Sequence, residues 1–102
     1  MIDVRISDDA LADLNDGFLF YEAQESGVGD YFLSHLRADV EGLKINAGTH
    51  PVVHDDFRRA LSKVFPYAIF YTMDDPSHAI VWAIVDCRRD PKWIETHVRT
   101  KA

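Results

Sequence analysis

Two apolar runs within residues 65–93 limit the fold of this chain more than any other feature of the sequence. Residues 67–72 and 79–85 carry β-branched and aromatic side chains at consecutive positions, a pattern typical of strands covered on both faces of a sheet. Residues 74–77 (DDPS) are rich in turn formers, so we predict an antiparallel hairpin. The rest of the chain must then cover this hairpin.

The first half of the chain predicts one strand followed by two helices. Residues 2–6 alternate apolar and polar side chains, as in a half-buried strand. Ser7 is a favourable N-cap, and apolar residues then recur at helical spacing up to Gly27, where the sequence GVG indicates a short hinge. A second helix with the same spacing ends at Gly48. The two helices are expected to bury their apolar stripes on the strands.

A further strand is predicted over residues 57–64, directly before the central hairpin. The element order is then β-α-α-β-β-β, an α+β class in which an N-terminal helical hairpin packs on a small, mostly antiparallel twisted sheet. The pattern leaves the conformation of residues 92–102 open. No linker or repeat divides the sequence, so residues 1–102 are expected to form a single domain.

The loop expected before that strand contains ligand chemistry in His50, His54, Asp55 and Asp56. The spacing of the two histidines suits a metal ion mainly on a helix, which Pro51 disfavours. We therefore expect a solvated loop with no metal, and no cofactor is predicted.

The formal net charge of −6 is unevenly distributed. Residues 1–50 contain ten acidic and three basic side chains, whereas residues 51–102 contain seven acidic and eight basic ones. An acidic chain lacks the long-range attraction that most nucleic-acid-binding proteins use, so direct nucleic-acid binding is expected to be weak or absent. Without a visible leader, a membrane-spanning run or paired cysteines, a cytoplasmic location is expected, with the single Cys87 buried in its strand.

Three motifs in this order carry a family resemblance: residues 18–32 (FLFYEAQESGVGDYF), residues 65–71 (FPYAIFY) and the strand end at residues 86–93 (DCRRDPKW). They resemble the RelE/ParE superfamily of small toxins from bacterial type II toxin–antitoxin systems, over residues 5–95. The resemblance implies the hairpin-on-sheet fold described above, a role in growth inhibition or plasmid stabilisation, and a cognate antitoxin protein as partner.

Within this superfamily, RelE-like members cleave mRNA on the ribosome, and ParE-like members are associated with poisoning DNA gyrase. Tyr67 stands where many RNA-cleaving relatives place an arginine, and the sequence lacks the Arg-Tyr or His-Tyr pair that closes those relatives. The resemblance therefore favours a ParE-like toxin that binds a protein target, DNA gyrase, rather than an enzyme. A RelE-like ribosome-dependent endoribonuclease and a degenerate, non-toxic relative are the alternatives.

The candidate target surface is cationic and lies on the predicted strand at 57–64 and just after the last strand. It consists of Arg58, Arg59, Lys63, Arg88, Arg89, Asp90 and Trp93. Its five cations are expected on one surface of the sheet, although strand alternation gives a single face only one of Arg58 and Arg59. Ordinary salt bridges to the many carboxylates are the competing interpretation.

Other candidates depend on which alternative holds. For an RNase, the candidate catalytic residues are Arg59, Arg88, Arg89 and His97. The candidate antitoxin contacts are Leu19, Phe20 and Trp93, because apolar side chains outside the main helical stripe need a partner to cover them. His35, His78 and His97 are otherwise expected to be isolated surface histidines, and Trp82 is expected in the core with its N–H bonded.

Overall fold

The computed structural model describes residues 1–101. Along the chain its elements are β1 (Asp3–Ile6), α1 (Asp8–Gln24), α2 (Val28–Asn46), β2 (Val52–His54), β3 (Phe57–Leu61), β4 (Tyr67–Asp75), β5 (His78–Asp86) and α3 (Pro91–Arg99). The predicted α+β class, with a helical hairpin on a mostly antiparallel sheet, is confirmed. Two elements were not part of the predicted order, the short strand β2 and the helix α3. No helix within residues 1–101 is long and apolar enough to cross a membrane.

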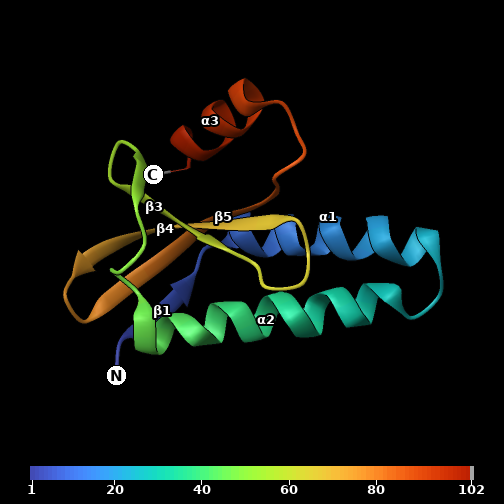
Figure 1. The fold of residues 1–102 in the computed structure, drawn as a ribbon, viewed down its shortest axis with the longest axis horizontal. Helices are drawn as coiled ribbons and strands as arrows, with labels where there is room; N and C mark the ends of the chain where they lie inside the picture. The colour runs from blue at the N-terminus through green and yellow to red at the C-terminus, as the bar shows by residue number, and fades with distance from the viewer. Residues whose placement is uncertain (102) are drawn as a thin grey trace.

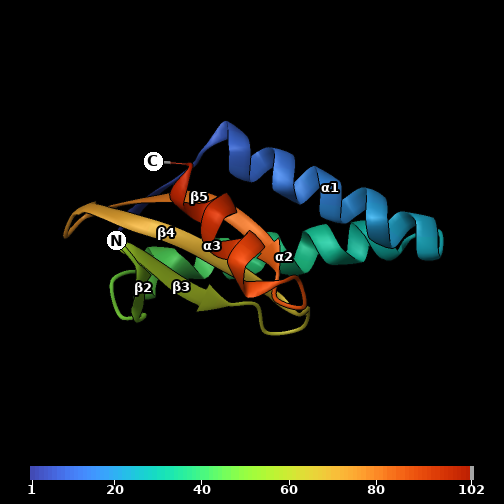
Figure 2. The ribbon, with the colours of Figure 1, turned by 90° about the horizontal axis from the view of Figure 1, so that it is seen from above.

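The sheet has five strands in the order β1-β5-β4-β3-β2, and β1 pairs with β5 in parallel while the other pairs are antiparallel. The helices α1 and α2 lie side by side on one face, and their tip projects beyond the sheet (Figures 1 and 2). The helix α3 lies across the opposite face (Figure 2). The central hairpin of β4 and β5 is therefore covered on both faces, as its consecutive apolar residues predicted.

A bulge in β5 divides its side chains between the two faces. Phe70 and Tyr71 of β4 face Ala83 and Val81, so Trp82 is an extra residue in the pairing. Val81 packs under the helical hairpin, whereas Ala83 packs on the side of α3. The half-buried Trp82 donates its indole N–H to Thr72 Oγ1 at 2.8 Å, which satisfies the polar group as predicted.

Ser7 and Gly27 set the points at which the two helices of the hairpin begin. Ser7 caps α1 by accepting the Ala10 N–H at 3.1 Å, as its position predicted. Gly27 has a φ of 92°, a left-handed conformation that favours glycine, and α2 starts directly after it. The connection between the helices is residues 25–27, so only Gly27 of the predicted hinge lies in it, and Val28 and Gly29 begin α2.

Residues 50–56 are not the solvated loop that was expected. Val52–His54 form the edge strand β2, and His50 Nδ1 lies 2.5 Å from the hydroxyl of the fully buried Tyr71. The same hydroxyl accepts the Gly48 N–H at 2.9 Å. Burial, together with the charge of Arg58, lowers the pKa of His50. The predicted strand at 57–64 ends earlier, at Leu61.

Candidate functional site

The basic strand end forms a tight turn between β5 and α3. Asp86 closes the strand, its carboxylate accepts the Arg88 N–H at 2.9 Å, and its carbonyl accepts the Arg89 N–H. Asp90 caps α3 by accepting the Lys92 N–H at 2.9 Å, and Pro91 starts the helix, where its missing N–H costs nothing. We call residues 88–91 the arginine ridge. Cys87 lies at its foot and is exposed, so the prediction of a buried cysteine is wrong.

Arg88 is bound by an acidic neighbour. Its Nε and Nη2 lie 2.9 and 2.7 Å from the two oxygens of Asp86, a bidentate, charge-assisted pair. The guanidinium accordingly lowers the pKa of the Asp86 carboxyl. Nη2 also approaches the Tyr21 hydroxyl at 3.5 Å. The charge of Arg88 is therefore compensated within the chain.

Arg89 starts a column of side chains that ties α3 to α1. Its guanidinium carbon lies 3.6 Å from the ring centre of Trp93, which stacks on His97 with ring centres 4.6 Å apart. His97 Nε2 lies 3.2 and 3.3 Å from the two carboxylate oxygens of Asp13. Asp13 in turn accepts the Ile84 N–H at 2.9 Å. The column thus joins three elements.

Burial raises the pKa of Asp13, against the opposing effects of the Ile84 amide and His97. The carboxylate is nevertheless well partnered, because the amide and the imidazole occupy both of its oxygens. Its role in the structure is consequently to hold α1, β5 and α3 together.

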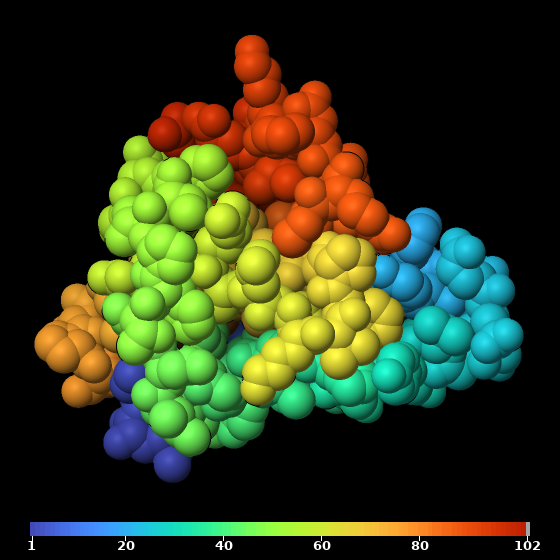
Figure 3. Space-filling view, viewed as in Figure 1, coloured from blue at the N-terminus to red at the C-terminus, as the bar shows by residue number. Residues whose placement is uncertain are grey.

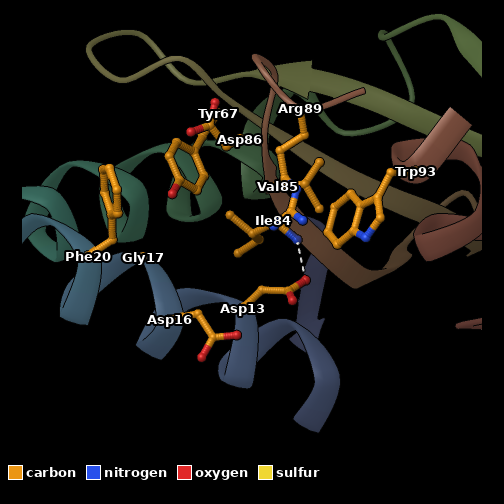
Figure 4. Close-up of a pocket in the computed structure, with 10 residues that line it drawn as sticks. All are labelled: Asp13, Asp16, Gly17, Phe20, Tyr67, Ile84, Val85, Asp86, Arg89 and Trp93. Atoms are coloured by element: carbon orange, nitrogen blue, oxygen red, sulfur yellow. Dashed lines mark hydrogen bonds between the residues drawn. The ribbon is translucent and has the colours of Figure 1, made fainter. Parts of the chain in front are cut away.

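A pocket of about 280 Å³ lies between α1, the end of β5 and the start of α3, and Figure 4 shows its lining. Phe20 and Trp93 contribute aromatic surface, and Asp13, Asp16 and Asp86 contribute carboxylates. Arg89 extends into the space between Asp13 and Trp93 (Figure 4). We call this the ridge pocket.

The phenol of Tyr67 also lines the ridge pocket. Burial, followed by the nearby charge of Asp86, raises the pKa of Tyr67 to about 12. This hydroxyl is therefore protonated at neutral pH.

Comparison with known proteins identifies the family of this chain. The family model described as the ParE toxin of type II toxin–antitoxin system, parDE, matches residues 4–91, most of the chain. The chain belongs to the ParE toxin family. A protein from the "Chromosomal ParDE TA system from P. aeruginosa" matches with a TM-score of 0.76 and 14% identity, covering 84% of this chain and 96% of that chain. At 14% identity this match supports a shared fold and no more. No curated protein matches the sequence.

This ParE-family chain does not gather its five cations on one surface, so that prediction is wrong. Arg58 faces the side of the helical hairpin, opposite the buried Tyr71, and donates to the His50 carbonyl at 2.7 Å. Arg59 faces the side of α3, as strand alternation requires. Lys63 lies beyond the end of β3. The residues of the ridge lie together with Trp93, and Arg59 lines a groove that Pro91 of the ridge also lines.

The three candidate antitoxin contacts of this ParE-family chain are exposed but not all adjacent. Leu19 is 56% exposed, Phe20 50% and Trp93 37%. Phe20 and Trp93 form opposite parts of the ridge pocket (Figure 4), whereas Leu19 does not line it.

Sequence reasoning missed two acidic residues that shape this site. The prediction that His97 is an isolated surface residue is wrong, since its side chain is 19% exposed and pairs with Asp13. His78 also pairs, with Asp75 at 2.9 Å. One signal for Asp13 was present: with Ala10, Leu14 and Gly17 it shares the helical spacing of the buried face of α1. The signal for Asp86 was its position before two arginines.

Proposed function

We propose that this ParE-family chain is a toxin that acts in the cytoplasm by binding a protein target, DNA gyrase, and that a cognate antitoxin neutralises it. The observation that carries the choice of binding over RNA cleavage is the bidentate Arg88–Asp86 pair. A cation already neutralised at 2.7–2.9 Å by its own carboxylate is poorly placed to stabilise charge that develops on a phosphate.

The other basic side chains support the same proposal. Arg58 lies on the opposite face of the sheet from Arg59, and Arg89 is directed onto Trp93. Cleavage of RNA requires several cations around one phosphate, together with an acid and a base within hydrogen-bond reach. Here the basic side chains are divided between the two faces of the sheet and the ridge, which supports binding over cleavage.

The proposed target surface is the arginine ridge with Trp93, extended by Arg59 and Lys63. Arginine and tryptophan are the side chains that contribute most often to protein–protein affinity, and the ridge presents them together. For the antitoxin we propose the exposed apolar side chains of α1, Leu19 and Phe20, together with Trp93. The two surfaces share Trp93, so an antitoxin bound there would also cover part of the target surface.

Induced expression in a bacterial host tests the proposal. We expect growth arrest with gyrase-dependent DNA breaks, and rescue when the protein encoded by the adjacent gene is expressed as well. The double variant Arg89→Ala/Trp93→Ala is expected to lose toxicity, whereas Arg37→Ala, an exposed position on α2, is the matched control and is expected to keep it. Normal growth and intact DNA at high expression would contradict the proposal and point to a degenerate relative.

One observation favours a second candidate function, an endoribonuclease of the RelE kind. His97 is held by a carboxylate, the arrangement that orients a catalytic imidazole, and it lies in the same column as Arg89. Mapping of transcript 5′ ends after induction decides this point. New ribosome-dependent ends that disappear with His97→Gln would support the nuclease; their absence would reject it.

A further inference from the structure

A second groove lies on the other side of the arginine ridge, between β3 and the start of α3. Its volume is about 320 Å³. Ala68 and Phe70, both buried, form an apolar floor, while Arg59 and Lys92 contribute positive charge. In Figure 3 the orange side chains of the ridge and α3 stand above the yellow-green ones of β3. We call this the β3–α3 groove.

The two cations of the groove lack acidic partners in the part of the chain that the structure describes. The ion pairs among residues 1–101 involve neither Arg59 nor Lys92. Glu95 is the one carboxylate that lines the groove within these residues, and it pairs with Arg99 at 2.5 Å along its own helix. The groove is thus locally positive on a chain whose net charge is −6.

Apolar surface continues from the groove along β3. Leu61 follows Arg59 by two residues, so both side chains point to the same face of the sheet, and Leu61 is 62% exposed. A ligand that matches this surface carries a carboxylate for the two cations and, next to it, an apolar group for Leu61. A protein segment with an acidic residue near an apolar residue has both groups.

A long polyanion fits this surface poorly. On the other side of the ridge, the ridge pocket presents Asp13, Asp16 and Asp86. A nucleic-acid strand that crossed the ridge from the groove would meet these carboxylates, in addition to the repulsion from the net charge. An isolated carboxylate in a protein segment avoids both costs.

We propose that the β3–α3 groove binds an acidic segment of the antitoxin, with one carboxylate between Arg59 and Lys92 and an apolar side chain against Leu61. The inference rests on the proposed function in taking an antitoxin as the partner. It adds the place on the toxin and the chemistry of the segment that binds there.

The single cysteine of the chain provides a direct test, because Cys87 is exposed and lines the groove. The rate of alkylation by iodoacetamide is measured for the free toxin and for its complex with the protein encoded by the adjacent gene. Alkaline pH is used, since burial raises the pKa of the Cys87 thiol. We expect alkylation to be slowed by about tenfold or more in the complex. In the Cys87→Ser background, Ile45→Cys at the far end of α2 serves as the control and should react equally in both states.

Affinity measurements supply the second readout. Arg59→Gln/Lys92→Gln is expected to weaken antitoxin binding by about tenfold or more. Arg37→Gln/Lys44→Gln removes the same charge from α2 and is expected to bind as the wild type does. All four positions are on or near the surface, so both variants should fold.

The outcomes separate the two proposals. Two outcomes would contradict the groove proposal and leave neutralisation by the antitoxin intact. In the first, Cys87 reacts as fast in the complex as in the free toxin; in the second, the Arg59→Gln/Lys92→Gln variant binds with full affinity. Failure of any complex to form on size-exclusion chromatography refutes neutralisation by that antitoxin, and the groove proposal with it.

Discussion

At Gly17, α1 packs closely against a side chain of α2. A Cβ at this position would lie 2.5 Å from Cζ of Phe32 and 3.4 Å from the Tyr67 hydroxyl. Phe32 is fully buried, so it can move only by disturbing a closely packed core. Gly17→Ala should therefore cost about 1–2 kcal/mol in urea unfolding, because overpacking outweighs the gain in helix propensity.

Gly42 is the matched control, since it also lies within a helix but nothing is within 4 Å of an added Cβ. Gly42→Ala should stabilise the protein by about 0.5–1 kcal/mol. Equal stabilities for the two alanine variants would show that α1 is not closely packed at Gly17.

His50 makes the stability of the protein depend on pH. The hydroxyl of Tyr71 accepts the Gly48 N–H and is also hydrogen-bonded to His50 Nδ1 at 2.5 Å. Because the pKa of His50 is lowered in the folded state, the folded protein binds the proton less tightly than the unfolded chain. The resulting stability is present above pH 6.5 and is lost as the pH falls through the lowered pKa.

We therefore predict that the free energy of unfolding decreases from pH 7.5 to pH 5 more steeply in the wild type than in His50→Gln. Urea unfolding at several pH values measures the difference. Identical slopes for the two proteins would contradict the prediction.

At the scale of elements, Asp13 connects α1, β5 and α3. Asp13→Ala leaves the Ile84 N–H without its acceptor and His97 without its carboxylate, and should cost about 2–3 kcal/mol. Asp13→Asn keeps an oxygen for the amide and should cost less. Thermal unfolding of the three proteins checks this order, and an alanine variant as stable as the wild type would contradict it.

The stability of α3 depends in part on its N-cap. Asp90→Ala removes the acceptor for the Lys92 N–H and should cost about 1 kcal/mol, chiefly within α3. Hydrogen exchange is therefore expected to accelerate at Ile94 and Val98 but not at Ile69 of β4. Asp74→Ala, an exposed change in the hairpin, serves as the control. Unchanged exchange in α3 would show that the cap does not hold it.

The elements that the sequence predicted are those with a recognisable apolar pattern, and they include the short strands β1 and β3. The helical hairpin and the strands β4 and β5 repeat an apolar pattern over many residues, whereas β2 spans three residues and has almost no pattern to recognise. The helix α3 has nine residues, too few to be stable alone, and its contacts with the distant Asp13 hold it in place. The bulge at Trp82 likewise depends on pairing with β4.

The sequence predicted the position of the basic turn in the candidate site but not the contacts of its side chains. Its basic turn was visible as Arg88-Arg89 before a capping Asp-Pro pair. The sequence does not show which arginine contacts Asp86 and which contacts Trp93. The fold of the turn decides this, because it directs Arg88 to Asp86 and Arg89 to Trp93. The prediction of a single cationic surface was wrong because it depended on the same kind of tertiary detail. Arg58 faces the side of the helical hairpin, and Lys63 lies beyond the end of β3.

The whole molecule combines a negative net charge with a localised basic ridge. Its acidic residues are concentrated in the first half, which forms the helical hairpin, and the arginine ridge lies on the opposite part of the chain sequence. The negative net charge disfavours the approach of nucleic acid to the molecule as a whole.

The most direct test of the central claim is a DNA cleavage assay with purified gyrase and the purified chain. We predict that the chain increases covalent gyrase–DNA cleavage complexes, that Arg89→Ala/Trp93→Ala does so far less, and that the antitoxin abolishes the effect. Unchanged gyrase activity, together with ribosome-dependent cleavage of mRNA by the same preparation, would contradict the account.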